Sequence, residues 1–222
     1  MLEKDLDEVI RKYEAHVPEG AVPAWILPPL SCKFLQEVAA HLPAGSMAFE
    51  FGSGRSTHAL RRVSAGTASV EHSAEWLNKT EESDESLPKR EKDYSAVVPL
   101  RRLWSRFRLI ESFPIEEHPQ VIERLKEARL ILVDSPPNPA KREHALFLAM
   151  RYAPIGAVIV LDDLEIRATA RFAHRLARQN RRQFRFWPMD IDHQLGVFLK
   201  LGTGRIRSRP SLIEFVGTWL RV

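Results

Sequence analysis

The chain has 222 residues, of which 44% are hydrophobic and 28% charged, with a formal net charge of +4 and a pI of about 9.4. This composition is typical of a globular protein, and we expect residues 1–222 to form a single domain. No apolar run is long enough to span a bilayer, the N-terminus lacks an apolar signal core, and Cys32 is the only cysteine, so we expect a cytoplasmic protein without an internal disulfide.

Apolar, β-branched runs alternate with helical patterns along most of the chain. We expect strands at 47–51, 67–72, 107–112, 130–134, 157–163, 184–190 and 195–202, and helices at 56–64, 115–128, 140–152 and 166–180. Continuously apolar middle strands favour burial on both faces, as in a parallel sheet wrapped by helices. The short link between the last two strands favours an antiparallel hairpin. The pattern predicts a doubly wound α/β domain with a mostly parallel, seven-stranded sheet and an antiparallel last strand.

Two segments fall outside this alternation. Residues 1–40 look helical, with an interruption at 22–32 that we expect to be extended and to carry Trp25 toward the site or the core. Residues 78–106 are long and polar and lie between the second and third expected strands. Such an insertion is either a mobile lid or a solvated loop.

The stretch "FEFGSGRST" turns from the first strand into a helix. Gly52 and Gly54 permit a tight turn and close approach of a ligand, and Ser56 can cap the helix that follows. Glu71 closes the second strand 21 residues after Glu50, where a carboxylate can accept hydrogen bonds from both hydroxyls of a ribose.

Two details argue against a nicotinamide dinucleotide at this turn. Position 57 is Thr, so the third glycine of the dinucleotide fingerprint is missing. Glu50 would repel a pyrophosphate, whereas it would favour the ammonium group of an amino-acid tail. A ribose, an adenine and a cationic amino-acid tail together describe S-adenosylmethionine. The alternative is a glycine turn that binds no nucleotide.

"FEFGSGRST" followed by "ASVEHSAEW" resembles motifs I and II of the class I S-adenosylmethionine-dependent methyltransferases, over roughly residues 45–202. The resemblance implies their Rossmann-like fold. It also implies cofactor-binding roles for residues after the first three strands. Those residues are Glu50, Gly52, Ser53, Gly54 and Ser56 for the methionine part, Glu71 for the ribose, and His72, Ser112 and Phe113 for the adenine, with Asp134 beside them.

Three carboxylates end two further strands. Asp134 closes one, and Asp162 and Asp163 close the next, so all three are expected at the rim that carries the glycine turn. They could hold a divalent cation such as Mg²⁺, which would bind and acidify a substrate hydroxyl. The alternative is that Asp134 orients the substrate or the cofactor amine, while Asp162 and Asp163 cap the next helix.

The spacing between Asp134 and the pair Asp162 and Asp163 is similar to that of the strand-end acids in metal-dependent catechol O-methyltransferases. The segment "VDSPP" also resembles a segment of the glucuronoxylan O-methyltransferase family. The resemblance implies a lysine base three residues after the first Asp, but this position is Pro137. Lys141, His144 or Asp134 itself is then the candidate catalytic base. His193, in the last hairpin, is expected either at the edge of the site or as a plain turn residue.

A basic stripe follows the fifth strand. Arg167, Arg171, Arg175, Arg178 and Arg182 recur at helical spacing and are expected to face solvent. The stripe is either a solvated face or a surface for nucleic acid.

The sequence therefore favours methyl transfer to the hydroxyl of a small molecule or a sugar, with no membrane partner and no indication of oligomeric state. RNA methylation, with docking through Arg167–Arg182, is the second hypothesis. A non-catalytic nucleotide-binding or interaction module is the third.

Overall fold

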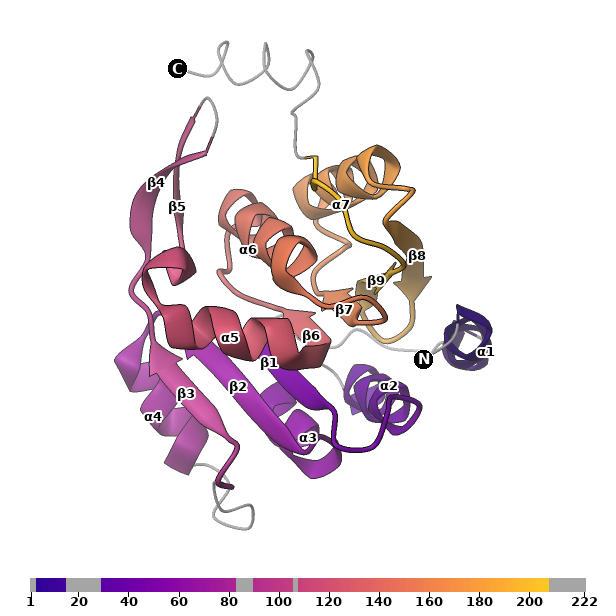
Figure 1. Cartoon of the computed structure of the whole chain (residues 1–222), viewed down its shortest axis with the longest axis horizontal. Coiled ribbons are helices and arrows are strands. Elements are labelled where there is room, and N and C mark those ends of the chain that lie inside the picture. Colours follow the sequence, from indigo (N-terminus) through magenta and orange to yellow (C-terminus); the bar gives the residue numbers. More distant parts are fainter. Residues whose placement is uncertain (1–2, 15–28, 83–89, 106–107, 208–222) are drawn as a thin grey trace.

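The computed structural model describes residues 3–14, 29–82, 90–105 and 108–207 (Figure 1). Its α-helices are α1 (Glu3–Glu14), α2 (Pro29–Ala40), α3 (Arg55–Val63), α4 (Ala74–Glu82), α5 (Pro119–Glu127), α6 (Pro139–Tyr152) and α7 (Arg167–Gln179), with a short 3₁₀ helix, η1 (Ile115–Glu117), before α5. Within these ranges, no helix combines the length and the apolarity that a membrane crossing requires.

The main sheet has seven strands. Their spatial order is β3 (Tyr94–Val97), β2 (Gly66–Glu71), β1 (Met47–Phe51), β6 (Ala128–Val133), β7 (Val158–Leu161), β9 (Gln194–Lys200) and β8 (Phe184–Asp190). The neighbours from β3 to β7 pair in parallel, whereas β9 is antiparallel to both β7 and β8. The predicted fold class is confirmed, including the antiparallel last strand.

The identity of the third strand was predicted wrongly. Residues 108–112 form β5, which pairs with β4 (Arg101–Ser105) in a separate antiparallel ribbon. Figure 1 shows this ribbon projecting beyond the main sheet. Its place in the sheet is taken by β3, which lies inside the interval 78–106 that the sequence marks as a polar insertion. β3 escaped prediction because it is a four-residue edge strand, half-buried to exposed, and therefore lacks a continuously apolar pattern.

The N-terminal region also differs from the prediction. α2 begins at Pro29, so the last four residues of the segment 22–32, which was expected to be extended, are helical. The remainder of that segment, including Trp25, lies outside the described residues.

Helices cover both faces of the sheet (Figure 1). α5, α6 and α7 pack on one face, and α1, α2 and α3 pack on the other. Side chains of β1 alternate between the hydrophobic cores on the two faces of the sheet, because successive strand side chains point to opposite faces. Phe49 and Phe51 join the core under α5 and α6, while Ala48 joins the core under α2 and α3. Glu50 therefore points toward α3.

The expectation that all five arginines of the basic stripe face solvent is wrong at one position. Arg175 is buried, because α6 lies beside α7 and its Glu143 accepts a hydrogen bond of 2.5 Å from the Arg175 guanidinium. Arg167, Arg171 and Arg178 on α7, and Arg182 just beyond its end, are exposed. Among the described residues these four form no ion pair.

Candidate active site

The glycine turn lies where the chain reverses its path across the sheet. β1 has β2 on one side and β6 on the other, so the crevice between β1 and β6 is the switch point at which ligands bind in such sheets. The loop after β6 contacts the loop after β1, because the backbone N–H groups of Asp134 and Ser135 both donate to the Phe51 carbonyl, at 3.1 and 2.8 Å. The two loops form one continuous rim.

Gly52 is required at the turn for two reasons. Its φ of +112° is unfavourable for a residue with a side chain, and an added Cβ would lie 3.0 Å from the Cβ of Ser135. Gly54, by contrast, is extended at φ 168°, and an added Cβ would meet no atom within 4 Å. The turn therefore packs against the loop after β6 at Gly52, whereas at Gly54 the space beside the backbone is empty.

We expect Gly52→Ala to lower the free energy of unfolding by about 1–3 kcal/mol, because the backbone strain and the contact with Ser135 add. Gly54→Ala is the matched control and should cost less than about 1 kcal/mol. Urea denaturation of the two variants and the wild type measures both values. Equal losses at the two positions would contradict this account of the turn.

Glu50 lies under the glycine turn and is fully buried. Its carboxylate accepts hydrogen bonds from the hydroxyls of Ser56 and Thr57, the latter at 2.5 Å. The Thr57 hydroxyl in turn accepts the Gly54 N–H at 2.8 Å, which ties the turn to the first turn of α3. Burial raises the pKa of Glu50 to about 7, although the two hydroxyls oppose the shift. The site therefore holds a carboxyl group that titrates near neutral pH.

The Glu71 carboxylate accepts hydrogen bonds from the loops after both β1 and β2. It accepts the backbone N–H groups of Ser53 at 3.1 Å, His72 at 2.7 Å and Ser73 at 3.0 Å, and the His72 Nδ1 lies 2.6 Å away. Trp76 adds a contact that the sequence did not indicate. Its indole N–H donates to the Ser53 carbonyl at 2.5 Å, and 47% of the residue is exposed. The carboxylate at the end of β2 is thus held in one orientation.

The residues expected near the adenine lie beside this group. Phe113 is fully buried and meets the His72 ring edge-on, with 6.4 Å between ring centroids. Ser112 is also buried, and its hydroxyl lies 2.9 Å from Nδ1 of His144 on α6. Burial lowers the pKa of His144 to about 4, so this histidine is neutral at physiological pH.

The strand-end carboxylates form a second cluster on the same rim. Asp134 retains 37% side-chain exposure, whereas the side chains of Asp162 and Asp163 retain 5% and 12%. Two cations lie among them. Arg142 on α6 forms an ion pair with Asp163, and His193 in the β8–β9 turn places Nε2 at 3.1 Å from Asp162 and 3.2 Å from Asp163.

These charges shift one another's protonation. Desolvation and the neighbouring Asp162 carboxylate raise the pKa of Asp134 well above its usual range. Burial alone would lower the pKa of His193, but hydrogen bonds to Asp162 and Asp163 raise it to about 10. Burial acts to raise the pKa of Asp163, yet His193 and Arg142 outweigh it and lower the value. The pKa of Asp134 is thus raised while that of Asp163 is lowered, and a pKa of about 10 keeps His193 protonated at neutral pH.

Sequence reasoning did not single out Arg142, and it left His193 between a site residue and a plain turn residue. Arg142 carries no signal that separates it from the other arginines of the chain. Lys141 and His144, the residues considered as bases in place of the lysine missing at position 137, have other partners: Lys141 pairs with Glu111 at 2.5 Å, and His144 with Ser112. Asp134 remains the candidate base.

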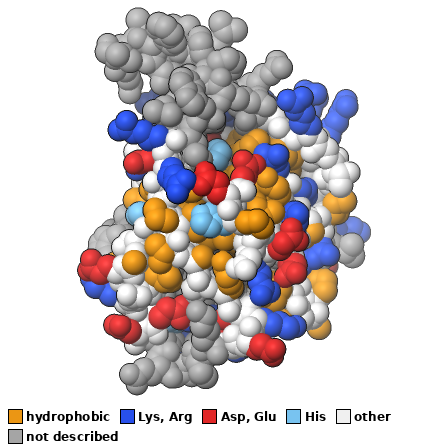
Figure 2. Space-filling model, turned by 60° about the vertical axis from the view of Figure 1, so that its left-hand side comes forward, with side chains coloured by type: hydrophobic (Ala, Val, Ile, Leu, Met, Phe, Trp, Pro, Cys, Tyr) orange, Lys and Arg blue, Asp and Glu red, His pale blue; other side chains and the backbone are white. Residues whose placement is uncertain are grey.

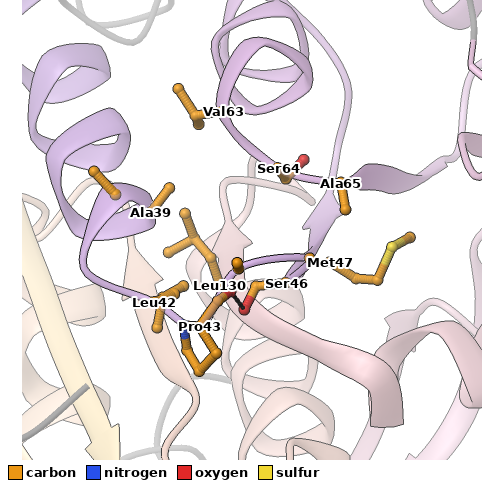
Figure 3. Close-up of a pocket in the computed structure, with 12 residues that line it drawn as sticks. Ala39, Leu42, Pro43, Ser46, Met47, Val63, Ser64, Ala65 and Leu130 are labelled. Carbon is orange, nitrogen blue, oxygen red and sulfur yellow. Dashed lines mark hydrogen bonds between the residues drawn. The ribbon is translucent and has the colours of Figure 1, made fainter.

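A separate hollow of about 250 Å³ lies at the opposite end of the sheet (Figure 3). Met47 and Leu130, near the amino ends of β1 and β6, line it together with Leu42 and Val63. Since Gly52 and Asp134 follow the carboxyl ends of the same two strands, this hollow is not part of the candidate site.

Figure 2 shows one face of the molecule, on which acidic, basic and histidine side chains are interspersed among hydrophobic ones.

The chain matches no protein-family model and no curated protein, but it matches solved structures along most of its length. A Staphylococcus aureus protein assigned as a caffeoyl-CoA O-methyltransferase superposes with a TM-score of 0.60 at 12% identity, covering 87% of this chain and 91% of that one. A Podospora anserina methyltransferase with bound S-adenosylhomocysteine gives 0.59 at 12% identity, covering 90% and 89%. A Clostridium thermocellum protein assigned as an rRNA methylase gives 0.55 at 11% identity, covering 78% and 96%. The chain therefore has the seven-stranded, Rossmann-like fold of the S-adenosylmethionine-dependent methyltransferases.

Proposed function

We propose that this protein is an S-adenosylmethionine-dependent methyltransferase. The observation that carries the proposal is the joining of the Gly52–Gly54 turn and the Glu71 carboxylate on one rim at the switch point of the sheet. Glu71 would hold the ribose, and the turn with Glu50 beneath it would hold the cationic methionine part. The cofactor, when bound, supplies an electrophilic methyl group on a sulfonium centre.

The residues present fit this cofactor. The turn is open at Gly54, so the backbone can be approached closely there. Glu71 already accepts three backbone N–H groups, so its carboxylate is oriented before any ligand binds and loses little freedom on binding. His72, Ser112 and Phe113 would line the site at the adenine end of the cofactor.

Calorimetric titration with S-adenosylhomocysteine tests the proposal. We expect binding of one ligand per chain with a dissociation constant well below 1 mM. A protein that stays folded and shows no heat of binding near 1 mM, a weak limit of about −4 kcal/mol, would overturn the proposal in favour of a non-catalytic module.

We further propose that the acceptor is a hydroxyl group of a small molecule or a sugar, with Asp134 as its general base. Asp134 is the most exposed of the three strand-end carboxylates, and its raised pKa makes it a better proton acceptor than an ordinary carboxylate. Asp134 would take the hydroxyl proton as the acceptor oxygen bonds to the methyl carbon and the bond from that carbon to sulfur breaks. The rim would contribute mainly by orienting the two reactants.

The Mg²⁺ that the sequence predicts fits this cluster poorly. Asp162, Asp163 and His193 do offer ligand atoms within 4.8 Å of one another. However, Mg²⁺ prefers an octahedron of oxygen atoms. Here Nε2 of a protonated His193 faces the two Asp carboxylates, and Arg142 is paired with the other oxygen of Asp163. We therefore propose no catalytic step through a metal.

Cofactor binding is expected to depend on pH through Glu50. Its pKa of about 7 means that protonation below pH 7 removes the negative charge under the turn, and the ammonium group of the ligand's amino-acid tail then loses a favourable interaction. We expect the affinity for S-adenosylhomocysteine to fall as pH is lowered from 8 to 6, by up to about tenfold per unit below pH 7. Titrations at several pH values should show this slope in the wild type and not in Glu50→Gln. An identical slope in both proteins would assign the titration to another group.

RNA is the second candidate acceptor. The observation that favours it is the exposed set Arg167, Arg171, Arg178 and Arg182, which forms no ion pair within the described part of the chain, since a basic face of this kind can contact phosphates. RNA binding that weakens steeply with salt, and weakens further in Arg171→Ala, would favour this acceptor over a small molecule.

We also propose that residues 1–222 form one domain and that the protein works in the cytoplasm. Core contacts in the described residues run from α1 to β9, which supports the first statement. The single cysteine is compatible with a reducing compartment.

A further inference from the structure

We infer that Arg142 and His193 are built-in cations that hold the strand-end carboxylates in place of a divalent metal, and that the site works without one. The inference deepens the proposed function and rests on it for its catalytic meaning. The cation site itself can be tested without any methyl acceptor.

His193 lies where a cation would be expected. Its Nε2 is 3.1 Å from an oxygen of Asp162 and 3.2 Å from oxygens of both Asp163 and Glu165, and only 9% of its side chain is exposed. A lone pair on Nε2 would be repelled by three carboxylates, whereas an N–H is attracted by all of them. The geometry thus favours an N–H at Nε2, the group that can donate to these carboxylates.

The turn that carries His193 is anchored independently. Asp192, the preceding residue, accepts the backbone N–H of Leu30 at 2.7 Å and the hydroxyl of Ser31 at 2.7 Å at the start of α2. The β8–β9 turn is therefore held on one side by α2 and on the other by the carboxylates after β7. His193 is a positioned group rather than a plain turn residue.

Arg142 joins the loops after β6 and β7. It is only 3% exposed, and its guanidinium donates to the backbone carbonyls of Asp134, Pro136 and Asp162 as well as to the Asp163 carboxylate. One buried side chain thus connects both strand ends that carry the candidate catalytic and metal-ligating acids. A divalent cation bridging the same acids would make the same connection.

A metal would have to displace this arrangement. A divalent cation between these carboxylates would lie beside the buried Arg142 guanidinium and meet strong repulsion in a partly desolvated site. To act as a ligand through Nε2, His193 would have to give up its contacts with these carboxylates. Arg142 would also have to give up its pair with Asp163. The site is occupied by the cations of the chain itself.

Titration with Mn²⁺, as a probe for hard divalent cations, tests this directly. We expect no stoichiometric binding to the wild-type protein at pH 7.5 up to about 1 mM Mn²⁺. His193→Ala removes the competing cation and should bind Mn²⁺ at least about tenfold more tightly than the wild type. His174→Ala is the matched control, because His174 is an exposed histidine on α7 whose ring packs edge-on against Phe186. It should leave Mn²⁺ affinity unchanged.

Nitrogen NMR of the wild-type histidine rings gives a second readout that needs no variant. We expect both ring nitrogens of His193 to be protonated at pH 7.5. A neutral His193 ring, tight Mn²⁺ binding to the wild type that Asp162→Asn abolishes, or equal Mn²⁺ affinity in the wild type and His193→Ala would each overturn the inference.

Parallel titration with S-adenosylhomocysteine keeps the two proposals apart. A protein that binds both S-adenosylhomocysteine and Mn²⁺ retains the proposed function and loses this inference. A protein that binds neither loses the proposed function, while the protonated His193 and its carboxylate partners still account for the failure of Mn²⁺ to bind.

Discussion

Replacing Glu71 with alanine is expected to weaken S-adenosylhomocysteine binding by at least about 100-fold. A hydrogen bond to a charged group contributes about 1.5–3 kcal/mol, and two ribose hydroxyls would lose their acceptor together. The same substitution leaves the N–H groups of Ser53, His72 and Ser73 without the carboxylate that orients them. Calorimetric titration measures the loss, and thermal unfolding shows whether the variant is folded at the temperature used.

Glu75→Ala is the control for this experiment. Glu75 lies four residues after Glu71, in the first turn of α4, is exposed, and forms a surface ion pair with Lys79 at 2.8 Å. Its removal should leave the affinity within about twofold, because exposed i,i+4 pairs contribute a few tenths of a kcal/mol. Wild-type affinity in a folded Glu71→Ala variant would show that the carboxylate at the end of β2 does not hold the ligand.

Replacing Asp134 with asparagine is expected to lower kcat by about 10²–10⁴-fold, the range that a positioned general base contributes. Asparagine keeps the shape of the side chain but cannot accept the proton. The rate is measured with a methyl acceptor found by screening hydroxyl-bearing compounds against labelled S-adenosylmethionine. Affinity for S-adenosylhomocysteine should stay within a few-fold of the wild type, since the glycine turn and Glu71 are untouched.

The pH profile separates this role from the alternative, in which Asp134 orients the cofactor amine. The raised pKa of Asp134 means that the carboxylate is protonated, and inactive as a base, up to a higher pH than an ordinary carboxyl group. Activity of the wild type should therefore rise with pH through a limb that lies above the usual carboxyl range. A loss of S-adenosylhomocysteine affinity in Asp134→Asn, with little change in kcat, would support the cofactor role instead.

The sequence located the loop residues of the candidate site through the order of its strands. Gly52, Glu71, Asp134 and Asp162 each directly follow or close a buried apolar run. Parallel strands bring all such ends to one edge of the sheet, so local patterns were sufficient to group them. Strand β3 was not found, because a short edge strand buries little surface and needs no apolar run.

Only the tertiary structure determined which charged side chains contact these residues. Arg142 meets Asp163 from a position 21 residues away, and His193 meets it from 30 residues away. Arg175 belongs to the same helical stripe as its exposed neighbours, yet it is buried because Glu143 on the adjacent helix pairs with it. The spacing of residues along a chain determines the face of a helix or the end of a strand on which they lie. Whether a charge there meets solvent or a buried partner depends on which distant element packs against it, and no local pattern encodes that contact.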